Sequence, residues 1–131
     1  MTKTLLIVTA LLEATAGFAL NASPSLLISL LLSSPLDSRS GSVVGRLAGV
    51  ALLTLGLVCW LARNDQPSRV TAGPVAAMLF YNVAVATLLA YARLSLGLSG
   101  IGLWPTVALH TGLALWCIAC LRTRSVKVRL L

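Results

Sequence analysis

The stretch LLIVTALLEATAGFALNASPSLLISLLL, residues 5–32, decides the fold class. A helix crosses the apolar part of a bilayer in roughly 20 residues, so this run is too long for one upright span. Ser23-Pro24 interrupts it with a typical helix start, a capping side chain followed by a proline that has no N–H to satisfy. We therefore predict a first span over 4–21 and a short apolar helix over 24–33. The alternative is one long tilted helix that is kinked at Pro24.

The short helix carries a stripe of serines. Ser25, Ser29 and Ser33 recur at every fourth position, which places them along one helix face. An apolar helix with such a stripe is suited to lie in the membrane interface, with its serines towards the lipid headgroups.

Three further apolar runs have the length of a membrane span: 43–62, 72–92 and 101–121. Apolar residues make up 58% of the chain, and charged residues make up only 10%, against roughly 25% in a soluble domain. The sequence thus predicts an all-α integral membrane protein with a single transmembrane domain over 1–131. Its fold is a four-transmembrane-helix bundle with a short interfacial helix or kinked extension after the first span. The short connections predict that consecutive spans pack as antiparallel neighbours.

The positive charges predict the orientation. The net charge is +7, but the basic residues are scattered over short loops and a tail, which excludes a nucleic-acid-binding face. Four spans put both termini on one side, which then carries seven Lys and Arg residues against three. Because such residues mark the cytoplasmic side, we predict a multi-pass inner-membrane protein with both termini cytoplasmic. The seven are Lys3, Arg63, Arg69, Arg122, Arg124, Lys127 and Arg129, and the three are Arg39, Arg46 and Arg93.

Small residues recur at helix-packing spacing in two of the spans. Gly45 and Gly49 are four residues apart, with Gly56 on the same face, and Ala108 and Gly112 repeat this spacing in the last span. Such residues let helix backbones approach closely in lipid. We expect them to pack helices within one chain rather than to form a dimer seam.

Polar side chains fall near the middle of three spans: Glu13 in the first, Tyr81 and Asn82 in the third, and His110 in the fourth. An ionisable side chain at the bilayer centre costs at least ~2.5–3.5 kcal/mol, so it rarely faces lipid. The shared depth predicts that these groups converge on one internal site.

The face of Glu13 also carries Thr9, which supplies a hydroxyl, and Gly17, which leaves room for a partner or a ligand. Burial disfavours the charged form of the Glu13 carboxyl. His110 can share a proton with it, and Asn82 can orient either group because an amide both donates and accepts.

Two interpretations fit this cluster. It either fixes the register of the helices or forms a site that binds or moves a small solute or a proton. The alternative for the whole protein is an accessory or scaffold subunit. The expected partners are the lipid bilayer and either further copies of the chain or a larger membrane complex, with no nucleic acid.

Two of the cysteines have the C-x-x-C spacing of redox and metal-binding motifs, but nothing else of such a motif. Cys117-Ile-Ala-Cys120 closes a helix at its C-terminal end, where the dipole does not favour a thiolate. We expect Cys59, Cys117 and Cys120 to be buried packing residues. No phosphate loop, metalloprotease motif or nucleophile elbow occurs in the sequence. We therefore expect no enzymatic activity, no metal and no cofactor.

One segment resembles a known family. Ala10-Leu-Leu-Glu13-Ala-Thr-Ala-Gly17, together with the four-span plan, is similar to the small multidrug resistance transporters. The resemblance implies that Glu13 alternates between protons and cationic drugs. It is confined to this segment, because the family has no bent apolar extension like 24–33 and this chain has no counterpart of its glycine-rich third-helix motif.

Overall fold

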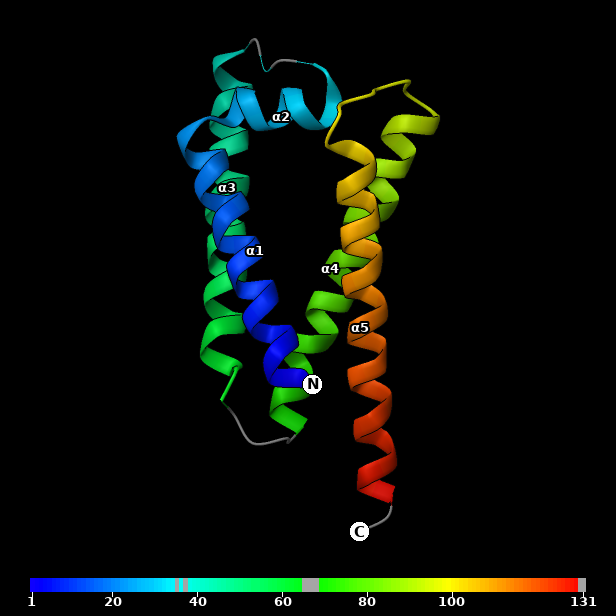
Figure 1. Ribbon diagram of the computed structural model, residues 1–131. Helices are drawn as coiled ribbons and strands as arrows, with labels where there is room; N and C mark the ends of the chain where they lie inside the picture. The colour runs from blue at the N-terminus through cyan, green and yellow to red at the C-terminus, as the bar shows by residue number, and fades with distance from the viewer. Residues whose placement is uncertain (35, 37, 65–68, 130–131) are drawn as a thin grey trace.

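The computed structural model is all-helical over the residues that it describes, 1–34, 36, 38–64 and 69–129, with side chains described outside 69–71 and 124–129 (Figure 1). No β-strand occurs in these ranges, which confirms the all-α part of the predicted fold class for them. The five described helices are α1 (Thr2–Ala22), α2 (Pro24–Leu32), α3 (Arg39–Ala62), α4 (Arg69–Leu94) and α5 (Leu103–Arg129). Four of them, α1, α3, α4 and α5, contain stretches that are long and apolar enough to cross a membrane.

The helix bounds differ from the predicted spans mainly at the ends. α3 begins at Arg39 rather than at 43, because Ser38 caps it by accepting a hydrogen bond from the amide of Gly41 at 2.9 Å. α5 continues to Arg129, beyond the predicted end at 121, since no helix breaker follows the apolar run. An apolar window locates a helix, but capping residues and breakers set its ends.

The four long helices form two pairs. α1 packs along α3, α4 packs along α5, and the two pairs diverge towards α2 (Figure 1). This differs from the predicted bundle of consecutive antiparallel neighbours, because α3 and α4 touch only sparsely. A short connection holds two helix ends together, but it does not force the helices to pack along their length. The glycines Gly49 and Gly56 of α3 pack on α1 instead.

Glycines create the contact between α1 and α3. A Cβ atom at Gly17 would lie 2.7 Å from the carbonyl oxygen of Gly49, and a Cβ atom at Gly49 would lie 2.8 Å from that of Gly17. A Cβ atom at Gly56 would lie 3.0 Å from the carbonyl oxygen of Ala10. The prediction that the α3 glycines pack helices within the chain is thus confirmed, with Gly45 packing on Pro24 of α2.

The corresponding prediction for α5 is wrong. Ala108 and Gly112 are exposed, and no described atom lies within 4 Å of a Cβ atom built at Gly112. The contact between α4 and α5 is made on another face of α5, which buries Leu113 and Cys117.

The hydrophobic core lies at the end of the molecule where both termini are found (Figure 1). It includes Leu5 and Leu6 from the first turns of α1 and Val75 of α4, so it contains residues of both helix pairs. All three cysteines are free and buried in it, as predicted for packing residues. The pairs are therefore held together at this end and separate towards the other.

α2 is a separate helix that lies across the opposite end (Figure 1). Ser23 has a non-helical backbone (φ −146°, ψ 75°), so the two helices are not one kinked rod. The predicted side-chain cap at Ser23 is absent; its carbonyl instead accepts a hydrogen bond from the amide of Leu27 at 3.3 Å. The prediction of a short helix that starts at Pro24 is confirmed.

Three hydrogen bonds join the end of α2 to the connection between α4 and α5, and we call them the α2 latch. The amide of Gly100 donates to the carbonyl of Leu31 at 3.1 Å, and the amide of Gly102 donates to that of Leu30 at 2.9 Å. The hydroxyl of Ser33 donates to the carbonyl of Ser99 at 2.7 Å. The amides satisfy carbonyls that every helix leaves without a partner at its C-terminal end.

Two of the three stripe serines donate hydrogen bonds to residues outside α2. Ser33 belongs to the α2 latch, and the hydroxyl of Ser25 donates to the carbonyl of Leu36 at 3.3 Å. Ser29 donates to a carbonyl of its own helix, that of Leu26, at 2.8 Å. The stripe expected to face lipid headgroups thus holds α2 to its neighbours.

Candidate functional site

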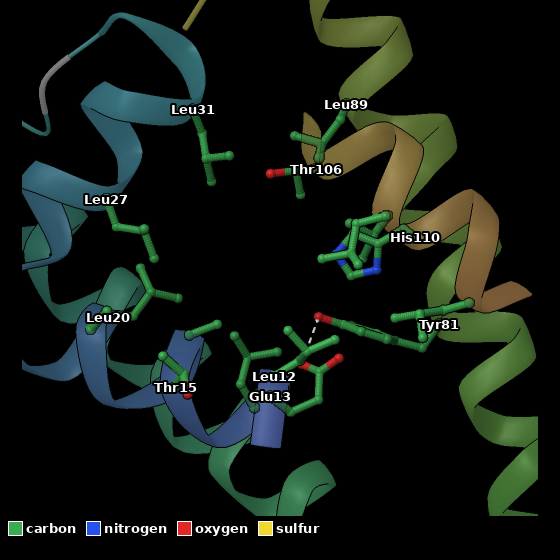
Figure 2. Close-up of a pocket in the computed structure, with 16 residues that line it drawn as sticks. Leu12, Glu13, Thr15, Leu20, Leu27, Leu31, Tyr81, Leu89, Thr106 and His110 are labelled. Carbon is green, nitrogen blue, oxygen red and sulfur yellow. Dashed lines mark hydrogen bonds between the residues drawn. The ribbon is translucent and has the colours of Figure 1, made fainter. Parts of the chain in front are cut away.

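A cavity of about 390 Å³ lies between the two helix pairs, on the α2 side of the core (Figure 2). Its volume falls within the range of ~300–1,000 Å³ that is typical of small-molecule sites. Eleven of its sixteen lining residues are Leu, Ala or Val. The five others carry polar groups: Glu13 and Thr15 of α1, Tyr81 of α4, and Thr106 and His110 of α5.

Glu13 lies at the inner end of the cavity, and its side chain is 3% exposed. The hydroxyl of Tyr81 donates a hydrogen bond to its Oε2 atom at 3.3 Å (Figure 2). This distance exceeds the 2.5–3.0 Å that is usual between two oxygens, so the bond is weak. No cation pairs with Glu13 among the described residues. A weakly bonded carboxyl at a cavity wall can accept a proton or a new hydrogen bond.

His110 is held by Asn82 from behind the cavity wall. Asn82 is fully buried, and its Nδ2 atom donates to the carbonyl of Met78 at 2.7 Å. This bond orients the amide so that Oδ1 faces the Nδ1 atom of His110 at 2.7 Å. Because Oδ1 only accepts, Nδ1 carries the proton, and the neutral ring keeps a lone pair on Nε2. The prediction that Asn82 orients a neighbour thus corresponds to a contact with His110.

Tyr81 lies between the two ionisable groups. Its ring meets that of His110 edge to face, with centroids 5.7 Å apart and an angle of 78° between the planes. Glu13 and His110, which we expected to share a proton directly, form no hydrogen bond with each other in the described structure. Tyr81 contacts both of them, and the three side chains follow one another along the wall.

Thr9 and Gly17 lie on the same helix as Glu13 but outside the cavity lining. Thr9 is 1% exposed, and its hydroxyl finds no hydrogen-bond partner among the described residues. The room that we expected beside Gly17 is occupied, because Gly49 and Leu53 of α3 fill it. The predicted cluster is therefore split: Glu13, Tyr81 and His110 reach the cavity, Asn82 supports one of them, and Thr9 is buried elsewhere.

Two lining hydroxyls escaped the sequence analysis. Thr106 precedes His110 by one helical turn, so the helical spacing could have identified it. Thr15 belongs to a different face of α1 from Thr9, and only the separation of the helix pairs makes that face part of a cavity wall. Neither hydroxyl adds a charge, and each donates to the carbonyl four residues before it, that of Gly102 for Thr106 and that of Leu11 for Thr15.

The arrangement favours recognition of a small molecule by hydrogen bonds within an apolar enclosure. Within the described residues, no group of three or more His, Cys, Asp or Glu side chains is placed to hold a metal ion. The cavity offers a carboxyl, a phenol and a ring nitrogen, with two threonine hydroxyls and aliphatic side chains in the rest of the lining. No protein-family model, curated protein or solved structure matches this chain.

Proposed function

We propose that the protein crosses the inner membrane four times and binds or moves a small solute or a proton between its two helix pairs. One observation supports this: polar groups from α1, α4 and α5 meet at one wall of an otherwise apolar 390 Å³ cavity. A cluster that only fixed helix register would have no need of an adjoining space. In this proposal Glu13 is the group that gains and loses a proton, and the function is not enzymatic.

The bilayer is the expected first partner, and both termini are expected on its cytoplasmic side. The bias of positive residues supports this orientation, although the side chains of Arg69, Arg124, Lys127 and Arg129 lie outside the described part. The Arg63 guanidinium lies 3.8 Å from the centroid of the half-exposed Trp60 ring, a pairing suited to the headgroup region.

Cysteine labelling tests the orientation. In a background with the three native cysteines replaced by alanine, Asn64→Cys and Ser95→Cys place single thiols at opposite ends of the molecule. An impermeant maleimide added to intact cells should label the second variant and spare the first. Labelling of Asn64→Cys without permeabilisation would invert the proposed topology.

Comparison of Glu13→Gln with Glu13→Ala tests the role of the carboxyl. Glutamine keeps the shape and the hydrogen-bonding capacity but cannot titrate, whereas alanine leaves Tyr81 without its acceptor. A pH titration of tryptophan fluorescence in the purified protein should show a transition in the wild type and none in Glu13→Gln, at similar thermal stability. His110→Gln must be measured beside it, since an unperturbed histidine titrates near pH ~6.5. Identical titrations of wild type and Glu13→Gln would remove the carboxyl from the function.

An accessory or scaffold role is the second candidate, and the outer face of α5 favours it. Ala108 and Gly112 are exposed there, and this open space lets another helix approach closely. If the chain assembles with itself or with a larger membrane complex through this face, Gly112→Leu should reduce the mass of the particle extracted in mild detergent. An unchanged mass would leave the cavity as the basis of the function.

A further inference from the structure

The cavity is closed at the α2 end and open at its sides. Leu27 and Leu31 of α2 point into it from that end (Figure 2), and the α2 latch connects α2 to the far helix pair. Along the sides, α1 contacts α5 only sparsely, and so does α3 with α4. The core closes the remaining end. The helix axes are thus blocked at both ends of the cavity, whereas few contacts close the space between the pairs.

The open sides lie along the apolar stretches of the four long helices. Large apolar side chains outside the cavity lining, such as those of Phe18, Leu88 and Leu115, are exposed on these helices. In a protein that spans the bilayer, such surfaces contact acyl chains rather than water. A molecule dissolved in the membrane therefore reaches the cavity without passing α2, whereas a solute in water must pass either α2 or the core.

The lining fits the same kind of molecule. The walls are mainly aliphatic, and the hydroxyls of Thr15 and Thr106 already donate to backbone carbonyls. In its neutral form His110 presents a lone pair on Nε2, because Asn82 accepts from Nδ1, and Glu13 has a carboxyl oxygen beyond the one that Tyr81 binds. A ligand that fits has an apolar body and one hydrogen-bonding group.

We propose that the cavity takes a lipid-soluble ligand with an apolar body and one hydrogen-bonding group, an inference that rests on the proposed function. This ligand enters sideways, between the two helix pairs. The α2 latch keeps water-soluble solutes out. Gly100 is central to this closure, because a Cβ atom there would overlap the backbone of Leu30 and Leu31. Any larger residue at this position separates α2 from the connection between α4 and α5.

Quenching of a single tryptophan in the full chain, reconstituted in vesicles, tests the route. The native tryptophans are replaced by phenylalanine, and Thr15→Trp places one indole in the cavity. The quenchers are phosphatidylcholine with a brominated acyl chain and acrylamide, which is soluble in water. Phe18→Trp, one turn further along α1 and 71% exposed, is the matched control outside the cavity lining. Leu89→Trp, on the opposite wall, replaces Thr15→Trp if the latter does not fold.

We expect the brominated lipid to quench Thr15→Trp strongly and acrylamide to quench it weakly. Adding Gly100→Val, or the milder Ser33→Ala, should raise acrylamide quenching several-fold in the cavity variant and leave the Phe18→Trp control unchanged. Strong acrylamide quenching with the latch intact would overturn the lateral route, and so would an indole that neither quencher reaches. The Glu13→Gln titration is independent of these results, so a failed route and a failed proton-binding role are separable.

Discussion

The two helix pairs are joined in different ways. Between α1 and α3, glycines bring the backbones so close that Gly17 and Gly49 each occupy the space of the other's missing side chain. Between α4 and α5, a partly buried side-chain hydrogen bond from His110 to Asn82 crosses the contact. The first contact depends on the absence of side chains, and the second depends on two particular ones.

The glycine contact mainly stabilises the fold, whereas the polar contact positions a chemical group at the cavity wall. A glycine contact tolerates almost no change, because backbone atoms cannot move aside as the end of a flexible side chain can. A polar contact costs less to lose but keeps an imidazole at the cavity wall in a defined orientation. Glu13 lies at the edge of the glycine contact, because a Cβ atom built at Gly56 would lie 3.5 Å from the Cβ atom of Glu13. The α1–α3 pair therefore presents the carboxyl from a rigid support.

The largest expected effect follows from breaking the glycine contact. Gly49→Leu places side-chain atoms against the backbone of Gly17 and the side chain of Asn21, and we expect destabilisation of ~3 kcal/mol or more. The matched control is Gly112→Leu on α5, where the described structure leaves open space. Thermal melting in detergent should show a large decrease for the first variant and little change for the second. Equal melting temperatures would contradict the close approach of α1 and α3.

A moderate effect is expected from breaking the polar contact. Asn82→Leu leaves the Nδ1 proton of His110 without its acceptor, and we expect a loss of ~1–2 kcal/mol, the scale of hydrogen bonds between membrane helices. Unfolding of Asn82→Leu, His110→Leu and the double variant gives the coupling energy between the two side chains. Strictly additive effects would show that this hydrogen bond does not join α4 to α5.

The smallest effect is expected at Thr9. Thr9→Val removes a buried hydroxyl that lacks a partner in the described structure and leaves the shape almost unchanged. Because an unpaired buried polar group is unfavourable, the variant should be as stable as the wild type or more stable by ~1 kcal/mol. Thr15→Val, at an exposed position, is the control and should be neutral. A clear loss of stability in Thr9→Val alone would reveal a partner for its hydroxyl.

Much of the helical content could be predicted from the sequence because it depends on local signals. Apolar length identified the four long helices, and Ser23-Pro24 identified the start of α2. The penalty for polar groups in lipid identified Glu13, Tyr81 and His110, which line the cavity.

The pairing of the helices and the α2 latch could not be predicted in this way. The latch joins backbone atoms of Leu30 and Leu31 to those of Gly100 and Gly102, and a glycine in a connection does not show which segment its backbone will meet. The cavity forms because α3 packs on α1 and not along α4. Nothing in the sequence around Thr15 indicates that it lines this cavity. Contacts between distant segments decide these features.

The latch also has a consequence for biogenesis. Its donors lie far along the chain from its acceptors, so the carbonyls at the end of α2 stay unpaired while the ribosome is still producing α4. Protection of the Gly100 and Gly102 amides from hydrogen exchange should therefore be among the last to appear as the nascent chain matures, well after the pairing of α1 with α3. Until that moment the N-terminal half would rely on water, lipid headgroups or an insertion chaperone to satisfy the exposed end of α2.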